Sequence, residues 1–268
     1  MGVPTFARFV IGLVYGVYEN KSGDLMMKKI AFISDIHGNL PAFKAVLKDI
    51  KENNCTEIVN LGDSIAIGPS PSEVLELLKS NSIESVLGNH ESYYIFGLEN
   101  QLNMHEGERE HQKWVHSTLG NKYKKYIMEF PLYNLRQIEG NQVLYLHYPS
   151  VMTEGNQPKF SSIPKDQNVE AFRKLFVPYD FNIVVFGHHH VSCCIYDKEF
   201  DQYYINTGSV GCSTNQLASY VIVCFENEEI EINQRAVEYD TSILVNEMIE
   251  RNPPEYENLL KWFYGIEI

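Results

Sequence analysis

Short apolar runs alternate with segments of helical spacing along the first half of the chain. The runs are the length of buried strands, and the apolar side chains of residues 40–53 fall on one helical stripe. Strand followed by helix predicts βαβ units, whose ligands gather beyond the carboxyl ends of the strands. The expected strands cover 28–34, 57–61, 83–87, 142–146 and 182–186, and the expected helices cover 40–53, 72–79 and 169–176.

The pattern changes twice further along the chain. Strand-like runs stop after residue 91, so we expect a helical insertion at about residues 92–130, after the third strand. Residues 191–236 alternate in short runs, which predicts an antiparallel meander forming a second sheet. The segment 241–263 predicts two helices packed on the outside. Without an internal repeat or an evident linker, residues 27–268 are expected to form a single domain.

The N-terminal segment has a different character. Residues 3–18 are mostly apolar, but Arg8 interrupts them, and the stretch is too short for a confident transmembrane helix. No signal-peptide cleavage site follows it. Because Met26 and Met27 immediately precede the first expected strand, we interpret residues 1–26 as an extension from a misplaced start codon. An N-terminal membrane anchor is the alternative.

Charge and cysteine content narrow the classes of function. The formal charge of −13 argues against a nucleic-acid-binding surface, which needs basic side chains to replace counterions. A phosphorylated substrate stays possible, because bound divalent metals reverse the sign of the charge locally. The five cysteines are odd in number and form no C-x-x-C pair, which is typical of reduced thiols in a cytoplasmic protein.

Side chains that can bind metals follow each of the expected strands. In the segment Gly187 to His190, two histidines stand at positions i and i+2, and on extended backbone their rings would point to the same side. Gly187 would let the chain turn sharply and approach another group closely. Imidazole and carboxylate are common metal ligands. The candidates are Asp35, His37, Asp63, Asn89, His147, His188 and His190, with His90 beside them.

These motifs occur in a fixed order. The series D-x-H-G-N at 35–39, G-D at 62–63, G-N-H-E at 88–91, His147 and G-H-x-H at 187–190 resembles the calcineurin-like metallophosphoesterases. The likeness covers roughly residues 28–225. N-T-G-S at 206–209 is similar to the N-P-G-S loop of the small bacterial phosphodiesterase branch, and residues 62–73 resemble members compared with diadenosine tetraphosphatases. The resemblance implies an α/β fold in which a two-sheet sandwich is flanked by helices.

The resemblance also implies a site for two divalent metals. Asp35, His37 and His190 would hold one metal, Asn89, His147 and His188 would hold the second, and Asp63 would bridge them. Two cations about 3.5–4 Å apart acidify a water molecule, so that a bridging hydroxide can attack a phosphoryl group. The ligand types suit Mn, Fe, Zn or Co, with Mn preferred.

Other residues receive roles from the same resemblance. His90 would be the catalytic residue, either stabilising charge on the phosphate or protonating the leaving oxygen. Asn39, Asn89 and His90 would contact the substrate, and Glu91 is a possible partner for His90. His189 occupies the variable position of its motif and is not expected to be a ligand. His105, His111 and His116, in the expected insertion, are interpreted as structural or solvated.

Departures from the family pattern limit the expected substrates. Ala66 and Ile67 stand where protein Ser/Thr phosphatases carry the Asp and Arg of G-D-x-x-D-R-G, so activity on phosphoproteins is not expected. Tyr148 follows His147 in place of the usual glycine and is expected to crowd the second metal. Thr207 replaces the usual proline.

The sequence therefore predicts a cytoplasmic, metal-dependent phosphoesterase that acts on a small phosphorylated molecule, either a monoester or a diester. Hydrolysis of a dinucleoside polyphosphate is a narrower alternative. The opposing class is a scaffold protein that keeps the fold without turnover, which would be free to lose ligands that this chain retains.

Overall fold

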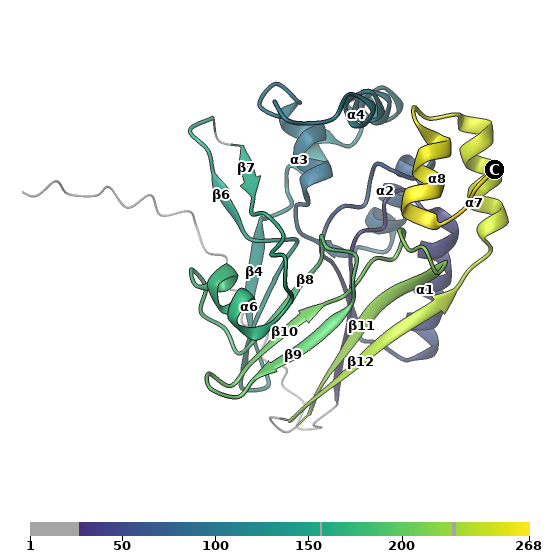
Figure 1. Ribbon diagram of the computed structural model, residues 1–268. Coiled ribbons are helices and arrows are strands. Elements are labelled where there is room, and N and C mark those ends of the chain that lie inside the picture. Colours follow the sequence, from purple (N-terminus) through teal and green to yellow (C-terminus); the bar gives the residue numbers. More distant parts are fainter. Residues whose placement is uncertain (1–26, 156, 227–228) are drawn as a thin grey trace, which may run out of the picture.

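The structure, a computed structural model, describes residues 27–155, 157–226 and 229–268, in which two five-stranded sheets form a sandwich flanked by helices (Figure 1). The expected α/β sandwich is confirmed. The strands of the first sheet are β12 (Glu229–Glu238), β11 (Leu217–Glu226), β1 (Lys28–Ile33), β2 (Glu57–Asn60) and β3 (Glu84–Ser85), in that order. The second sheet runs β4 (Tyr133–Ile138), β5 (Asn141–Leu146), β8 (Ile183–Phe186), β10 (Gln202–Asn206) and β9 (Cys193–Asp197).

Each sheet has a parallel centre. In the first sheet, β1, β2 and β3 are parallel, and in the second sheet β8 is parallel to both of its neighbours, β5 and β10. Ile30 and Phe32 of β1 pack against Val143 and Tyr145 of β5 in a dry layer between the sheets. Burial on both faces explains why these strands read as continuous apolar runs.

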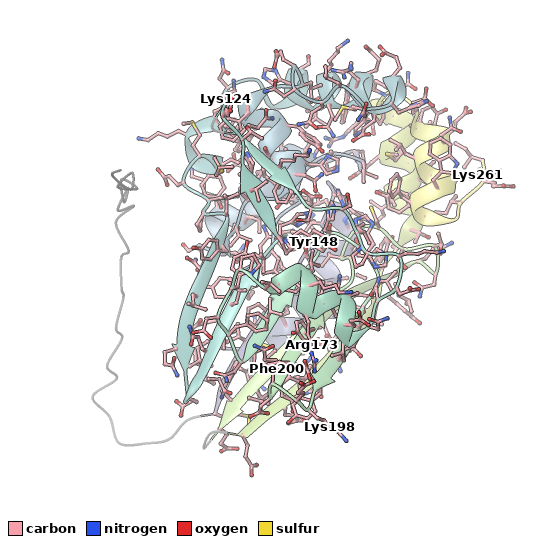
Figure 2. All side chains as sticks on the ribbon, turned by 60° about the vertical axis from the view of Figure 1, so that its left-hand side comes forward. Lys124, Tyr148, Arg173, Lys198, Phe200 and Lys261 are labelled. Atoms are coloured by element: carbon pink, nitrogen blue, oxygen red, sulfur yellow. The ribbon has the colours of Figure 1, made fainter. Side chains whose placement is uncertain are left out.

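Helices cover the outer faces of both sheets. The apolar stripe of α1 (Leu40–Glu52) and that of α2 (Pro71–Ser80) pack against the first sheet. Phe172 and Phe176 of α6 (Val169–Phe176) pack against Phe186 and Tyr204 of the second. Arg173, on the exposed side of α6, pairs with Asp197 of β9 and lies over the Phe200 ring (Figure 2).

The prediction that residues 191–236 form a meander in a sheet of their own is wrong. β9 and β10 join β8 in the second sheet, whereas β11 and β12 belong to the first, with Lys28 of β1 opposite Phe225 of β11. Period-two alternation reports which faces of a strand are buried but carries no information about its neighbour. The nearly continuous apolar sequence of β11 was the available sign of an interior strand.

Three strands were not expected from the sequence. β4 alternates exposed and half-buried residues at the edge of its sheet, and β6 (Ser150–Met152) and β7 (Pro158–Phe160) form a separate two-stranded ribbon. Many side chains of these short strands are exposed or half-buried, so the sequence lacks the continuous apolar run by which a buried strand is recognised. The third strand is also shorter than expected. It covers only Glu84–Ser85, and α3 begins a few residues later, at Asn89.

The region after β3 is helical, as expected. It contains α3 (Asn89–Phe96), α4 (Glu106–Leu119) and α5 (Lys124–Ile127), and α7 (Thr241–Arg251) and α8 (Tyr256–Tyr264) follow β12 (Figure 1). His111 of α4 accepts a hydrogen bond from the Ile67 backbone N–H at 2.7 Å, and its other ring nitrogen faces the Pro254 carbonyl at 3.4 Å. A buried histidine thus connects the loop after β2 to the C-terminal helices. None of the helices in the described ranges is both long and apolar enough to cross a membrane.

His111 is expected to make the fold sensitive to acid. Burial, which disfavours the charged ring, lowers its pKa to about 4 from the ordinary 6.5. Between these values the unfolded chain binds the proton first, so stability falls as the pH drops from 6.5 to 4, by about 3 kcal/mol. The measurement is the free energy of unfolding of the wild type and of His111→Gln across this range. A difference between the two that does not change with pH would contradict the expectation.

Candidate metal centre

Four strands deliver the predicted ligands to one edge of the sandwich. Asp35 and His37 follow β1, Asp63 follows β2, and His147 follows β5. His188 and His190 follow β8, and Asn89 starts α3. Because these strands end together, the structure brings all seven predicted ligands and His90 into one region, at the place where two sheets meet.

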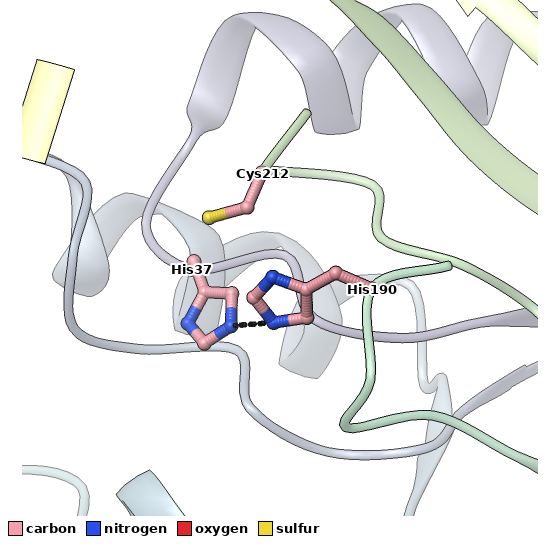
Figure 3. A group of neighbouring side chains, drawn as sticks. All are labelled: His37, His190 and Cys212. Carbon is pink, nitrogen blue, oxygen red and sulfur yellow. Dashed lines mark hydrogen bonds between the residues drawn. The ribbon is translucent and has the colours of Figure 1, made fainter. Parts of the chain in front are cut away.

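One cluster contains Asp35, His37 and His190. The Nε2 atoms of His37 and His190 lie 3.0 Å apart (Figure 3). The Oδ1 atom of Asp35 lies 3.2 Å from His190 Nε2 and 3.5 Å from His37 Nε2. Asp35 is fully buried, and its other oxygen accepts a hydrogen bond from the His188 backbone N–H at 2.9 Å. Two imidazoles and a carboxylate therefore face a common point.

A second cluster forms around His147. Its Nε2 atom lies 3.1 Å from Asn89 Oδ1, 3.2 Å from His188 Nδ1 and 3.3 Å from Asp63 Oδ2. Its Nδ1 atom lies 2.9 Å from the Leu61 carbonyl, which fixes the orientation of the ring. Asp63 has ligand atoms close both to this cluster and to His37, so its carboxylate is shared between the two groups.

These residues fit a pair of divalent cations. Two imidazole nitrogens 3.0 Å apart can share only one proton, and Asp35 Oδ1 is a buried oxygen without a hydrogen-bond partner among the described residues. A bound cation would be coordinated by the two imidazole nitrogens and by Asp35 Oδ1 together. Imidazole nitrogen with carboxylate oxygen is a donor set for Mn, Fe, Zn or Co, and this set does not choose among them.

The charges of the carboxylates agree with this interpretation. Burial alone would raise the pKa of Asp63, but His147 and His90 beside it hold that pKa below its usual value. Burial opposes ionisation of Asp35 in the same way, and His190 lowers its pKa well below the ordinary value. Both groups are therefore anionic near neutral pH, as ligands of a cation must be.

The backbone of five of the seven predicted ligands is not extended, which corrects the predicted geometry. Asp35, His37, Asp63, His188 and His190 all have positive φ, between 48° and 72°. Each strand ends in a sharp turn, and it is this turn that aims the ligands inward. Asp, Asn and His tolerate this left-handed region better than most residues, although it still stores strain at the site. Gly187 does allow the expected close approach, since a Cβ there would meet Ser34 Oγ.

Glu91 is not the partner of His90. Its carboxylate accepts hydrogen bonds from the backbone N–H groups of Asp63, Ser64 and Gly88, at 2.8, 2.7 and 3.2 Å. Burial and the charge of Asp63 raise the pKa of Glu91 to about 7. Glu91 thus joins the turn after β2 to the start of α3, and it holds Asp63 in place from behind.

Sequence reasoning missed two residues at the centre. Gln112 of α4 contacts the His90 ring, and Cys212 lies in the loop before β11 with its sulfur near His37 and His190 (Figure 3). Burial raises the pKa of the Cys212 thiol well above its usual value. Neither residue falls within a motif, and both are brought to the site by tertiary contacts.

Two further predicted positions have different surroundings. Asn39 is fully buried, caps α1 by accepting from Ala42 N–H, and donates to the Gly211 carbonyl, so it has no atom free for a substrate and we do not carry it into the site. Tyr148 is buried, and its ring centre lies 4.8 Å from that of His188. It supports this ligand from the side.

The fold and the clustered ligands together define a metallophosphoesterase-like protein. Residues 27–228 match the family model of the calcineurin-like phosphoesterase superfamily domain. The chain belongs to this superfamily, whose members generally bind divalent metals and hydrolyse phosphoester bonds.

Relatives cover nearly the whole chain. An uncharacterized protein of Methanocaldococcus jannaschii is 30% identical over 253 residues, which are 87% of this chain and 96% of that protein. The crystal structure of a metallophosphoesterase from Sphaerobacter thermophilus has 26% identity and a TM-score of 0.68, covering 87% of this chain and 96% of its own. A hypothetical protein from Pyrococcus horikoshii, with 18% identity and a TM-score of 0.75, shares the fold over 90% of this chain and 99% of its own.

Proposed function

We propose that this protein is a dinuclear-metal phosphoesterase that hydrolyses a small phosphorylated molecule, either a monoester or a diester. The observation that supports this most is the convergence of seven ligand-type side chains on two clusters that share Asp63. A scaffold without turnover would have no need to keep a buried carboxylate oxygen such as Asp35 Oδ1 without a hydrogen-bond partner among the described residues, which is costly.

The two clusters divide the ligands between two cations. Asp35, His37 and His190 would hold one, Asn89, His147 and His188 the other, and Asp63 would contact both. When bound, two such cations supply positive charge for the phosphoryl oxygens and make a neighbouring water more acidic. Manganese is the metal that we would add first, because hard oxygen ligands from the substrate suit it well.

His90 is the residue next to this pair that is best placed to act on substrate. Its Nε2 atom lies 3.8 Å from Asp63 Oδ2, and its backbone N–H donates to Asp63 Oδ1 at 2.9 Å. Burial lowers the pKa of the ring, so it is mainly neutral near pH 7. From this position the ring can stabilise charge on the phosphoryl group or protonate the leaving oxygen.

The surroundings favour a small substrate. Ala66 and Ile67 are buried apolar residues after β2, so this loop supplies no guanidinium to hold a phosphoprotein.

Within the described residues, all five cysteines are free thiols, which supports a cytoplasmic setting.

Hydrolysis of p-nitrophenyl phosphate and bis-p-nitrophenyl phosphate, with and without added Mn²⁺, tests the proposal. We expect turnover that depends on the metal and that chelation abolishes, and the preferred compound will distinguish monoesterase from diesterase activity. Bound metal is measured in parallel by elemental analysis. Protein that holds two metals per chain but cleaves neither compound nor other small phosphoesters would favour the scaffold.

A further inference from the structure

Gln112 is the one side chain among the described residues that hydrogen bonds to the His90 ring. Its Nε2 atom lies 2.5 Å from His90 Nδ1. Both side chains are buried, with Gln112 only 4% exposed. Gln112 comes from α4, which packs on α3 (Figure 1) and on α2.

The type of contact determines where the imidazole carries its proton. An amide nitrogen is only a donor, so the ring nitrogen that faces it must be an acceptor without a proton. The single proton of the neutral ring is then on Nε2, the nitrogen on the side of Asp63.

We propose that Gln112 is a positioning residue that holds His90 as its Nε2–H tautomer, so that His90 acts as a neutral hydrogen-bond donor to a phosphoryl oxygen. This rests on the proposed phosphoesterase function. Of the two roles given for His90 above, this tautomer favours stabilising charge on the phosphoryl group over protonating the leaving oxygen. A ring held neutral in this way stabilises charge but gives up no proton to the leaving oxygen, because that would leave an imidazolate.

Other groups around the ring do not compete for this role. Glu91 is occupied by three backbone N–H groups, and the His37 and Tyr93 rings meet His90 edge-on, with centres 5.2 and 5.7 Å away. Beyond its ring, His90 is held by its backbone N–H, which donates to Asp63 Oδ1. Among the described residues, Gln112 therefore makes the one side-chain hydrogen bond that orients the ring.

The tautomer can be measured without any assay of activity. The protein is labelled with [¹⁵N]histidine and loaded with Zn²⁺, which is diamagnetic, and the His90 ring is assigned by its absence in His90→Ala. We expect the proton on Nε2 and a bare Nδ1 in the wild type. Gln112→Glu, which offers only acceptors, is expected to move the proton to Nδ1. A wild-type ring protonated at Nδ1 would overturn the proposal.

Kinetics tests the consequence for turnover. Gln112→Met keeps the volume but removes the donor, and kcat is expected to fall about 10- to 100-fold, with KM and bound metal unchanged. The matched control is Gln157→Met, since Gln157 is also 4% exposed but lies in the turn between β6 and β7. In a His90→Ala background, Gln112→Met should have no further effect, which a merely structural role would not produce. An unchanged kcat in Gln112→Met would refute the positioning role.

The leaving group distinguishes a hydrogen-bond donor from a general acid. Phenolate leaves less readily than p-nitrophenolate and needs a proton more. If His90 acts as a neutral donor, His90→Ala slows phenyl phosphate and p-nitrophenyl phosphate by the same factor. A markedly greater loss with phenyl phosphate would identify a general acid and contradict the proposal. If the metal-loaded wild type cleaves no small phosphoester, neither these monoesters nor bis-p-nitrophenyl phosphate, the proposed function fails, while the tautomer measurement still decides the role of Gln112.

Discussion

Asp63→Asn is expected to remove the bound metals and to lower turnover by about 10³-fold or more. The asparagine keeps the shape of the side chain, and its Oδ1 can still accept the hydrogen bond from the His90 backbone N–H. What is lost is the negative charge that both clusters share, together with one ligand atom. Two cations close to one another repel without an anion between them, and their contribution to the reaction is several kcal/mol.

The measurement combines elemental analysis with initial rates on the better p-nitrophenyl substrate. Asp197→Asn is the matched control, because Asp197 is also a buried carboxylate but lies in β9, where it pairs with Arg173. This control should keep its metals and its activity. If Asp63→Asn remained active with two metals bound, the assignment of Asp63 as the shared ligand would be refuted.

His90→Ala should also lower turnover, but unlike Asp63→Asn it should leave the metal content intact. His90 adjoins both clusters but is not one of the seven predicted ligands, and we expect kcat to fall about 10²-fold, as is typical when one preorganised donor is removed. Rates and bound metal are measured together. His116→Ala, an exposed position on α4, is the control and should behave like the wild type. Loss of metal in His90→Ala would mean that His90 is a ligand.

Much of the candidate site could be predicted because strand ends are visible in the sequence. The apolar runs before Asp35, Asp63 and His188 are buried on both faces, so each run ends abruptly where the polar ligands begin. Parallel strands place such ends at one edge, and the order of the motifs matched a known family. The pattern of apolar runs and the spacing of the motifs were therefore sufficient to predict which residues come together as ligands.

What was missed depends on contacts between distant segments. The positive φ of the ligand residues follows from how each turn packs on its neighbours, and local spacing suggested extended backbone instead. Gln112 shares one stripe of α4 with Val115 and Leu119, which indicates a buried face but does not identify His90 as its partner. The sheet to which β11 belongs was set by its pairing with β1, almost two hundred residues earlier in the chain. Such pairings are tertiary properties.

The separation of the ligands along the chain has a consequence for how the protein is made. His37 and His190 are 153 residues apart, and their turns follow strands of different sheets. A growing chain cannot complete the first cluster until His190 has left the ribosome and the second sheet has formed on the first. If the site binds metals as proposed, loading of the first cluster would therefore be a late event in biosynthesis.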